Sequence, residues 1–187
     1  MKTLVYFRNL LSDKYVASVA PSSRFAIERI LSKIDFTQNN VIIEFGPGTG
    51  NFTLDILKQM TKSSKLIAIE RNRNFYGMLK RELKDQRMML FNECAGNLNR
   101  ILGYNGHGCV DYIVSGIPFS LISDELKQTI LNSTHVALKK GGKFLSYQTF
   151  YQPAGHLRNH LKRLYATVCT EYVLRCLPPL SICEAVK

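Results

Sequence analysis

Short runs of aliphatic residues alternate with amphipathic stretches along most of this chain. The runs are rich in Val, Ile and Leu and are too short for buried helices, so each of them predicts a strand. We expect strands at about 41–45, 65–70, 87–91, 110–115 and 143–149, and two extended segments at about 168–175 and 181–186. Helical patterns lie between them, and two more, at 2 to about 14 and at 22–34, precede the first strand. This alternation predicts an α/β fold with N-terminal helices, in which a Rossmann-like, doubly wound and mostly parallel sheet has seven strands.

The helix expected after the fourth strand has signals at both ends. Asp124 and Glu125 follow Ser123, and acidic residues suit the positive end of a helix dipole. Two lysines and then two glycines occupy residues 139–142. Basic residues followed by glycine are typical of a helix C-terminus, so we expect this helix to end there.

The first strand continues directly into a glycine-rich loop. Residues 41–50 read VIIEFGPGTG, with glycine at every second position after Phe45. Glycine permits positive φ and lets a ligand approach the backbone closely. Glu70 ends the second aliphatic run, twenty residues after Gly50. A glycine loop and a carboxylate at the ends of adjacent strands predict a nucleoside site, in which the carboxylate accepts hydrogen bonds from the two ribose hydroxyls.

Two classes of ligand use this layout. A dinucleotide fingerprint has the spacing G-x-G-x-x-G, whereas here G-x-G-x-G is followed by Asn51. A reductase also needs a proton donor, and the Tyr-x-x-x-Lys pair from Tyr76 to Lys80 lies just after Glu70, far from where a reductase would use it. The loop resembles motif I of class I S-adenosylmethionine-dependent methyltransferases. The spacing therefore favours a methyl donor over a dinucleotide, and either ligand over a bare turn.

Composition limits the class of protein without identifying it. The 187 residues suffice for one domain with a substantial core, so we treat 1–187 as a single unit. Hydrophobic residues make up 45% and charged residues 21%, as in ordinary globular proteins. The net charge of +11 and the pI of about 9.6 indicate an anionic partner, either nucleic acid or an acidic membrane surface.

Cysteine usage and hydropathy bear on the location of the protein. The five cysteines have no Cys-x-x-Cys spacing, so we expect reduced thiols in a cytoplasmic protein and no metal site. No apolar run is long enough to cross a bilayer, and Arg8, Asp13 and Lys14 interrupt any secretory signal. We expect a monomer.

The fourth strand leads into a second motif, DYIVSGIPF at residues 111–119. Its place resembles motif IV of amino-methylating enzymes, Asn-(Leu/Pro)-Pro-(Tyr/Phe). A proline loop of this kind points backbone carbonyls at one spot, where they accept N–H bonds from the substrate nitrogen. Gly116 stands where nucleic-acid enzymes have Asn or Asp, so the acceptor for a flat exocyclic amine is missing. The alternative is a plain turn stabilised by Pro118.

Four segments together are similar to the bacterial phospholipid N-methyltransferases. They are VAPSSR at 19–24, SGIPFS at 115–120, QTFY at 148–151 and LPP at 177–179, and the resemblance spans about residues 14–186. It implies transfer of up to three methyl groups from S-adenosyl-L-methionine to phosphatidylethanolamine, giving phosphatidylcholine and S-adenosyl-L-homocysteine. One departure is Cys94, which replaces the aspartate expected to bind the adenine amino group. Either Glu93 substitutes for that aspartate or the contact is lost.

These motifs indicate three groups of site residues. For the methyl donor they are Tyr15, Glu44, Gly46, Pro47, Gly48, Gly50, Glu70, Arg71, Cys94, Ala95 and Ser115. For the lipid they are Arg24, Ile117, Pro118, Phe119 and Phe150, and for catalysis Ser115, Gly116 and Tyr151. Tyr151 and Tyr15 are candidates for carrying the proton away from the amine, and Phe119, Phe150 and Tyr151 for holding a methylated ammonium by cation–π attraction. The alternative for these rings is core packing.

The N-terminal segment fits a lipid substrate. One helical stripe carries Leu4, Phe7, Leu10, Leu11 and Tyr15, with Lys2, Arg8 and Lys14 around it. Such a helix can lie in the headgroup layer of an anionic membrane, which predicts a peripheral protein on the inner face of the membrane. A helix packed over the donor site as core is the alternative. In the same way, the serines before Arg24 suit a helix cap, and Arg24 could instead hold a lipid phosphate.

Two other functions remain open at this point. An rRNA adenine N6-dimethyltransferase would share the glycine loop and the basic charge, but Gly116 and the end of the chain just after the last strand favour lipid over nucleic acid. A domain that binds the donor or lipid without turnover is the other, and Cys94 is its best support.

Overall fold

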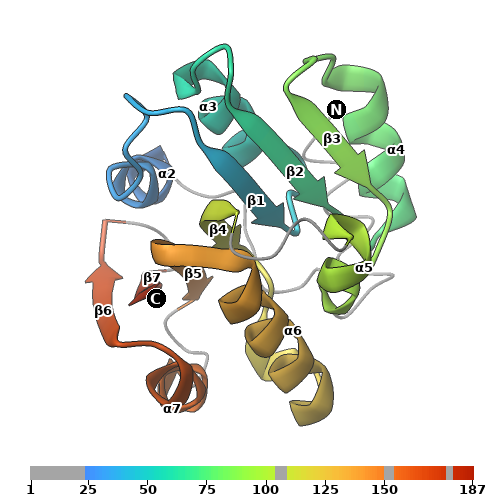
Figure 1. The fold of residues 1–187 in the computed structure, drawn as a ribbon. Coiled ribbons are helices and arrows are strands. Elements are labelled where there is room, and N and C mark those ends of the chain that lie inside the picture. The colour runs from blue at the N-terminus through green and yellow to red at the C-terminus, as the bar shows by residue number, and fades with distance from the viewer. Residues whose placement is uncertain (1–23, 104–108, 150–153, 176–178) are drawn as a thin grey trace.

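The computed structural model describes residues 24–103, 109–149, 154–175 and 179–187 (Figure 1). Their centre is a seven-stranded sheet in the order β3-β2-β1-β4-β5-β7-β6, in which β7 runs antiparallel to the other six strands. The strands are β1 (Val41–Phe45), β2 (Lys65–Ile69), β3 (Met88–Phe91), β4 (Val110–Ser115), β5 (Leu138–Thr149), β6 (Thr167–Val173) and β7 (Leu180–Val186). The predicted mostly parallel, seven-stranded Rossmann-like fold is confirmed.

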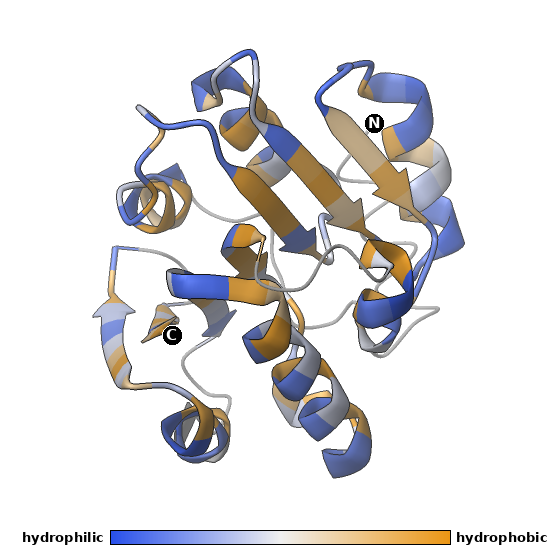
Figure 2. Ribbon diagram, in the orientation of Figure 1, coloured by the Kyte–Doolittle hydropathy of each residue, from blue (hydrophilic) through white to orange (hydrophobic). Residues whose placement is uncertain are grey.

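Helices cover both faces of this sheet. They are α2 (Arg24–Leu31), α3 (Asn51–Gln59), α4 (Arg73–Glu82), α5 (Leu98–Leu102), α6 (Asp124–Ala137) and α7 (Ala154–Leu164), with 3₁₀ turns η1 (Ala95–Asn97) and η2 (Phe119–Leu121). Ile42 packs with α2 and α3 on one face, and its neighbour Ile43 packs with α5, α6 and α7 on the other. Alternate residues of the central strands are therefore buried on opposite faces, which explains why these strands are almost continuously apolar (Figure 2).

The register of the central strands brings three loops to one edge. Phe45 of β1 lies opposite Ile69 of β2 on one side and opposite Ser115 of β4 on the other. The Gly46 N–H donates to the Ile69 carbonyl at 2.9 Å, and the Gly116 N–H donates to the Phe45 carbonyl at 3.0 Å. The chain crosses from β1 to β2 on one side and reaches β4 on the other, so this edge is the switch point where α/β sheets bind ligands.

The end of α6 differs from the prediction. The helix begins as expected, with the Ser123 hydroxyl accepting from the Leu126 N–H, but it ends at Ala137 instead of residues 139–142. β5 begins at once, because Leu138 pairs with Val110 before a shift of register. Gly141 takes a φ of 78° in the irregular stretch that follows, and a Cβ on Gly142 would lie 2.9 Å from the Lys139 carbonyl oxygen. The glycines thus serve a kink in a strand, and the expected start of this strand at 143 was wrong.

The other expected elements agree with the structure to within two residues at most ends. In the predicted helix 22–34, α2 occupies Arg24–Leu31. The expected helix at 2–14 lies outside the described residues. Among the residues that the structure does describe, none of the helices is long and apolar enough to span a membrane.

Candidate functional site

The loop after β1 forms an open cradle. Gly46, Gly48 and Gly50 have φ angles of 71°, 57° and 77°. A Cβ added at Gly48 would meet no atom within 4 Å, so the space beside this backbone is open to a ligand. Pro47 is buried, and its carbonyl accepts from the Gly50 N–H at 2.9 Å, which closes the loop onto the start of α3. All three glycines therefore take the positive φ that the glycine pattern predicted, and the backbone at Gly48 is left uncovered.

Glu70 lies directly across from this loop. Its Oε2 accepts from the Gly48 N–H at 2.9 Å, and its Oε1 accepts from the Asn72 N–H at 2.7 Å. The side chain is 6% exposed, and Asn72 in turn caps α4 by accepting from two backbone N–H groups. The carboxylate is thus held at the mouth of the glycine loop, where a ribose would meet it. Arg71, the next residue, is exposed.

Glu44 is the most buried carboxyl group of the site. It is 1% exposed, and neither of its oxygens, nor the Thr53 hydroxyl oxygen, has a hydrogen-bond partner among the described residues. Burial raises the pKa of Glu44 to about 8. The nearby polar side chain of Thr53 lowers this pKa somewhat, and the negative charge of Glu70 raises it further. This carboxyl, two residues before the first glycine of the loop, is therefore mostly protonated at neutral pH.

In the loop after β3, the Glu93 side chain has partners close by in the sequence. Its carboxylate accepts from Asn97 Nδ2 at 2.8 Å and pairs with Arg100, and these contacts lower its pKa. Glu93 is therefore engaged with its own loop and helix. Cys94 is a half-buried free thiol and Ala95 is buried in the core. Substitution of Glu93 for the expected aspartate would require it to leave these partners.

The bend after β4 is fixed by local hydrogen bonds. Ser115 is fully buried, and its hydroxyl oxygen accepts from the Ile117 N–H at 3.3 Å. The Ile117 carbonyl accepts from Gln148 Nε2 at 3.4 Å, which ties the bend to β5. Pro118 is buried at the start of η2. The Ser115–Pro118 segment thus lies where motif IV predicted it, beside the loop of β1.

Tyr147 is a residue of this site that sequence reasoning missed. A Cβ built on Gly116 would lie 2.6 Å from the Tyr147 hydroxyl oxygen and 3.5 Å from the Gly46 carbonyl oxygen. The Tyr147 ring is 5% exposed and stacks on Phe52, with 5.6 Å between ring centroids. The hydroxyl therefore occupies the place that a side chain at position 116 would take. Parallel pairing of Ser115 with Ser146 puts Tyr147 at this edge, a signal available once the register is known.

Two of the expected lipid contacts, Phe119 and Arg24, lie in very different surroundings. Phe119 was expected to present a face to the substrate, but it is 1% exposed and packs edge-on against Phe144, with 6.2 Å between ring centroids. It is a core residue, so that expectation was wrong. The Arg24 side chain is 90% exposed and pairs with Glu28 at 2.9 Å on the surface of α2. Tyr15, Phe150 and Tyr151 lie outside the described residues.

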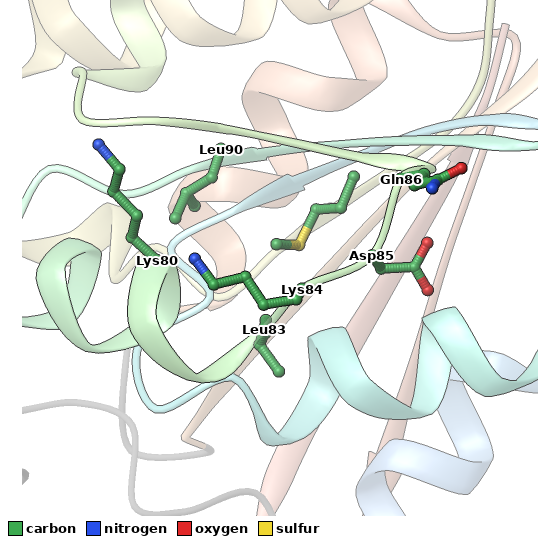
Figure 3. A pocket seen from close by; sticks show the side chains of 7 residues that line it. Lys80, Leu83, Lys84, Asp85, Gln86 and Leu90 are labelled. Atoms are coloured by element: carbon green, nitrogen blue, oxygen red, sulfur yellow. The ribbon is translucent and has the colours of Figure 1, made fainter.

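A second concave surface lies away from this edge. A pocket of about 480 Å³ between α4 and β3 has Lys80 and Lys84 on one side and Asp85 and Gln86 on the other (Figure 3). Because it surrounds the turn that precedes β3, it opens near the amino ends of the strands and shares no residue with the site above. No group of three or more His, Cys, Asp or Glu side chains in the described parts of the chain could hold a metal ion.

Comparisons with known proteins agree with the fold, but the similar proteins methylate two different kinds of substrate, ribosomal RNA and a lipid. The profile of the ribosomal RNA adenine dimethylase family matches residues 21–140. Ornithine lipid N-methyltransferase of Singulisphaera acidiphila is 27% identical over 184 residues, which are 92% of this chain and 90% of that protein. Ribosomal RNA small subunit methyltransferase A of Mycoplasmopsis synoviae is 33% identical over 120 residues, which are 64% of this chain and 39% of that protein.

Solved structures resemble the whole described fold. One is the Burkholderia thailandensis 1,6-didemethyltoxoflavin-N1-methyltransferase, solved with 1,6-didemethyltoxoflavin and S-adenosylhomocysteine bound. Its TM-score is 0.66 at 16% identity, covering 97% of this chain and 82% of the other. At this identity the likeness concerns the fold.

Proposed function

Because the chain belongs to the ribosomal RNA adenine dimethylase family of S-adenosylmethionine-dependent methyltransferases, we propose that it methylates an amino group, and that this amino group is carried by a membrane lipid. The methyl donor, S-adenosyl-L-methionine, supplies an electrophilic methyl group. Phosphatidylethanolamine is the acceptor that the sequence favours, and the ornithine lipid named for the Singulisphaera acidiphila relative is the nearest variant of the same chemistry.

The residues of the described edge fit this donor. The open backbone at Gly48 leaves room for the chain that joins the sulfonium to the amino acid, and the Glu70 carboxylate lies where it can accept from the ribose hydroxyls. The unpartnered Glu44 carboxyl suits the ammonium of the donor's amino acid. We also propose that Arg71, Cys94 and Ala95 lie next to the bound nucleoside.

The arrangement of Gly116 and Tyr147 is the observation that favours a lipid amine over a base amine as the methyl acceptor. A planar base amine is bound by a side-chain acceptor and stacked between flat faces. Here Gly116 has no side chain, the Tyr147 hydroxyl fills its place, and Phe119 is buried against Phe144. An aliphatic amine needs no stacking face, and the hydroxyl oxygen of Tyr147 can accept its N–H. These features support a headgroup amine better than an adenine.

In methyl transfer to an amine, the main task of the protein is to position the two reactants. The amine attacks the methyl carbon in line, so orienting the two reactants accounts for most of the rate enhancement that the protein must supply. The amine must first lose a proton, because an ammonium has no lone pair. The buried bend from Ser115 to Pro118 disfavours the charged form and so favours that loss.

Methylation of rRNA adenine is the second candidate, since the family profile and the Mycoplasmopsis synoviae relative both point to it. One experiment separates the two. The purified protein is incubated with methyl-labelled donor and, in parallel, with phosphatidylethanolamine vesicles, ornithine lipid vesicles or small-subunit rRNA. We expect label in lipid. Label in rRNA alone would replace this proposal with the second candidate, and label in none of the three would refute both.

A further inference from the structure

Three of the six most exposed large apolar side chains of the described residues lie at one end of the sheet. Phe25, near the start of α2, is 52% exposed, Tyr172 of β6 is 60% exposed, and Leu174, just after β6, is 75% exposed. Surface leucines and phenylalanines scattered singly need no explanation, so what matters is whether these three lie close together.

Contacts between α2 and β6 show that they do. Val173 packs against a small cluster formed by Ala26 and Leu180, and Arg29 Nη2 pairs with Glu171 Oε2 at 2.7 Å about one helical turn later. Residue numbers rise along α2 while they fall along β6, so the two elements run antiparallel. The start of α2 therefore lies at the end of β6, toward which the arrowhead of β6 points (Figure 1).

This end of β6 belongs to the edge that holds the candidate site. β5 and β6 both run antiparallel to β7, so they are parallel to each other and to β1. Val173 and Thr149 both pair with Leu180, which puts the ends of β5 and β6 at the same level. The exposed side chains therefore lie along the same edge of the sheet as the glycine loop and the Ser115 bend, at its outermost strand.

Basic residues flank the apolar ones. Arg24 precedes Phe25 and has a 90% exposed side chain, although Glu28 is its partner, and the exposed Arg175 follows Leu174. Apolar side chains between guanidinium groups match a layer in which anionic headgroups lie above acyl chains. Phe25 and Tyr172 could also stack on bases, but Leu174, the most exposed of the three, offers no flat face, so a bilayer is the partner that fits all three side chains.

We propose that the β6–α2 rim, defined as Arg24, Phe25, Tyr172, Leu174 and Arg175, docks on an anionic bilayer and turns the carboxyl edge of the sheet toward the lipid. The inference rests on the proposed function, because a lipid acceptor has to reach this edge. It concerns residues other than the N-terminal stripe, and it fixes the orientation of the enzyme on the membrane.

The chain contains no tryptophan, which makes the test direct. Leu174→Trp introduces a single indole at the rim, and Val136→Trp is the matched control. Val136 is 46% exposed and lies at the end of α6, next to the start of β5 and so at the opposite edge. With vesicles of phosphatidylethanolamine and phosphatidylglycerol we expect a blue shift for Leu174→Trp, quenching by brominated acyl chains, and neither effect for Val136→Trp. Equal quenching of both, or of neither, would overturn the proposed orientation.

Binding measurements complete the test. Arg175→Ala should weaken binding to anionic vesicles about fivefold, the factor that corresponds to about 1 kcal/mol per basic residue near the surface. The Phe25→Ser, Leu174→Ser double variant should lose more than about tenfold, since two apolar side chains no longer enter the layer. Lys140→Ala, an exposed basic residue at the opposite edge, is the control and should bind like the unchanged protein. Loss of rRNA binding with vesicle binding intact would make the rim a nucleic-acid surface and would refute docking.

A soluble short-chain phosphatidylethanolamine, below its micelle concentration, separates the two proposals. The rim variants should methylate it as fast as the unchanged protein, because no membrane is involved. Turnover with unaltered vesicle binding by the variants would refute docking and leave the proposed function standing. Rim-dependent vesicle binding without methylation of any amino lipid would refute the proposed function and leave docking standing.

Discussion

The carboxylate of Glu70 accepts a hydrogen bond from the backbone N–H of Gly48 at 2.9 Å. This contact joins the end of β2 to the middle of the glycine loop after β1. Glu70 holds the loop, and in the function proposed above it also accepts from the ribose hydroxyls, so its loss should affect both the shape of the cradle and its contact with the ligand.

We therefore expect Glu70→Gln to weaken binding of S-adenosyl-L-methionine about tenfold to hundredfold, the range for a hydrogen bond to a charged group. Gln keeps the size of the buried side chain, so the fold should persist. Titration calorimetry measures the affinity, and circular dichroism checks folding. Glu82→Gln, an exposed position on α4, is the control. Unchanged donor affinity in Glu70→Gln would mean that Glu70 is misassigned.

Gly48→Val should abolish donor binding, because its side chain enters the open space beside the loop. Gly48 has a φ of 57°, so any larger residue there is also strained, by about 1–3 kcal/mol. Gly141→Val separates the two effects. Gly141 has a φ of 78° and equally open surroundings, but it lies near the start of β5, at the opposite edge. Both variants should unfold at lower urea concentration, and only Gly48→Val should lose the donor in calorimetry. Loss of donor binding in both would point to strain alone.

Sequence periodicity located the strands well, because each buried strand is a compact aliphatic run between polar breaks. It failed at residues 138–142, where Gly141 and Gly142 read as a helix end although they serve an irregular strand. Local residue types cannot distinguish these two uses of glycine; the pairing of Leu138 with Val110 decides between them. Tyr147 was missed for a similar reason. Its meeting with Gly116 depends on the register between β4 and β5, and only tertiary structure supplies that register.

Glu44 predicts a specific dependence of stability on pH. Its pKa in the folded protein is raised from 4.5 to about 8. Between these values the folded protein keeps a proton that the unfolded chain has lost, so the free energy of unfolding falls as pH rises. The slope from this group approaches about 1.4 kcal/mol per pH unit and vanishes above the folded pKa.

Glu44→Gln removes this titration while keeping the shape of the side chain. Urea unfolding at pH 5, 6, 7 and 8 should therefore show that the variant gains on the unchanged protein as pH rises. The difference between the two proteins is the readout, since every other titrating group is common to both. A difference that stays constant across this range would show that Glu44 titrates at its ordinary pKa.

Gly116→Ala should destabilise the protein by about 1–3 kcal/mol, the usual cost of overpacking. The added Cβ would lie 2.6 Å from the Tyr147 hydroxyl oxygen and 3.0 Å from its Cζ. Tyr147 cannot easily withdraw, because it is buried and stacked on Phe52. The same substitution at Gly77 is the control. Gly77 lies within α4 with open surroundings, so Gly77→Ala should stabilise the protein by about 0.5–1 kcal/mol.

A double-mutant cycle tests whether the contact itself is responsible. In a Tyr147→Leu background the ring and hydroxyl are gone, and the cost of Gly116→Ala should shrink by about 0.5–3 kcal/mol. Tyr147→Phe isolates the hydroxyl: it keeps the ring on Phe52, and it should lower the rate of methyl transfer to lipid about twofold to tenfold, as for the loss of one neutral hydrogen bond, with donor affinity unchanged. If Gly116→Ala costs the same in both backgrounds, Tyr147 does not enforce glycine at this position. The absence of a side chain there would then need a cause other than the tyrosine.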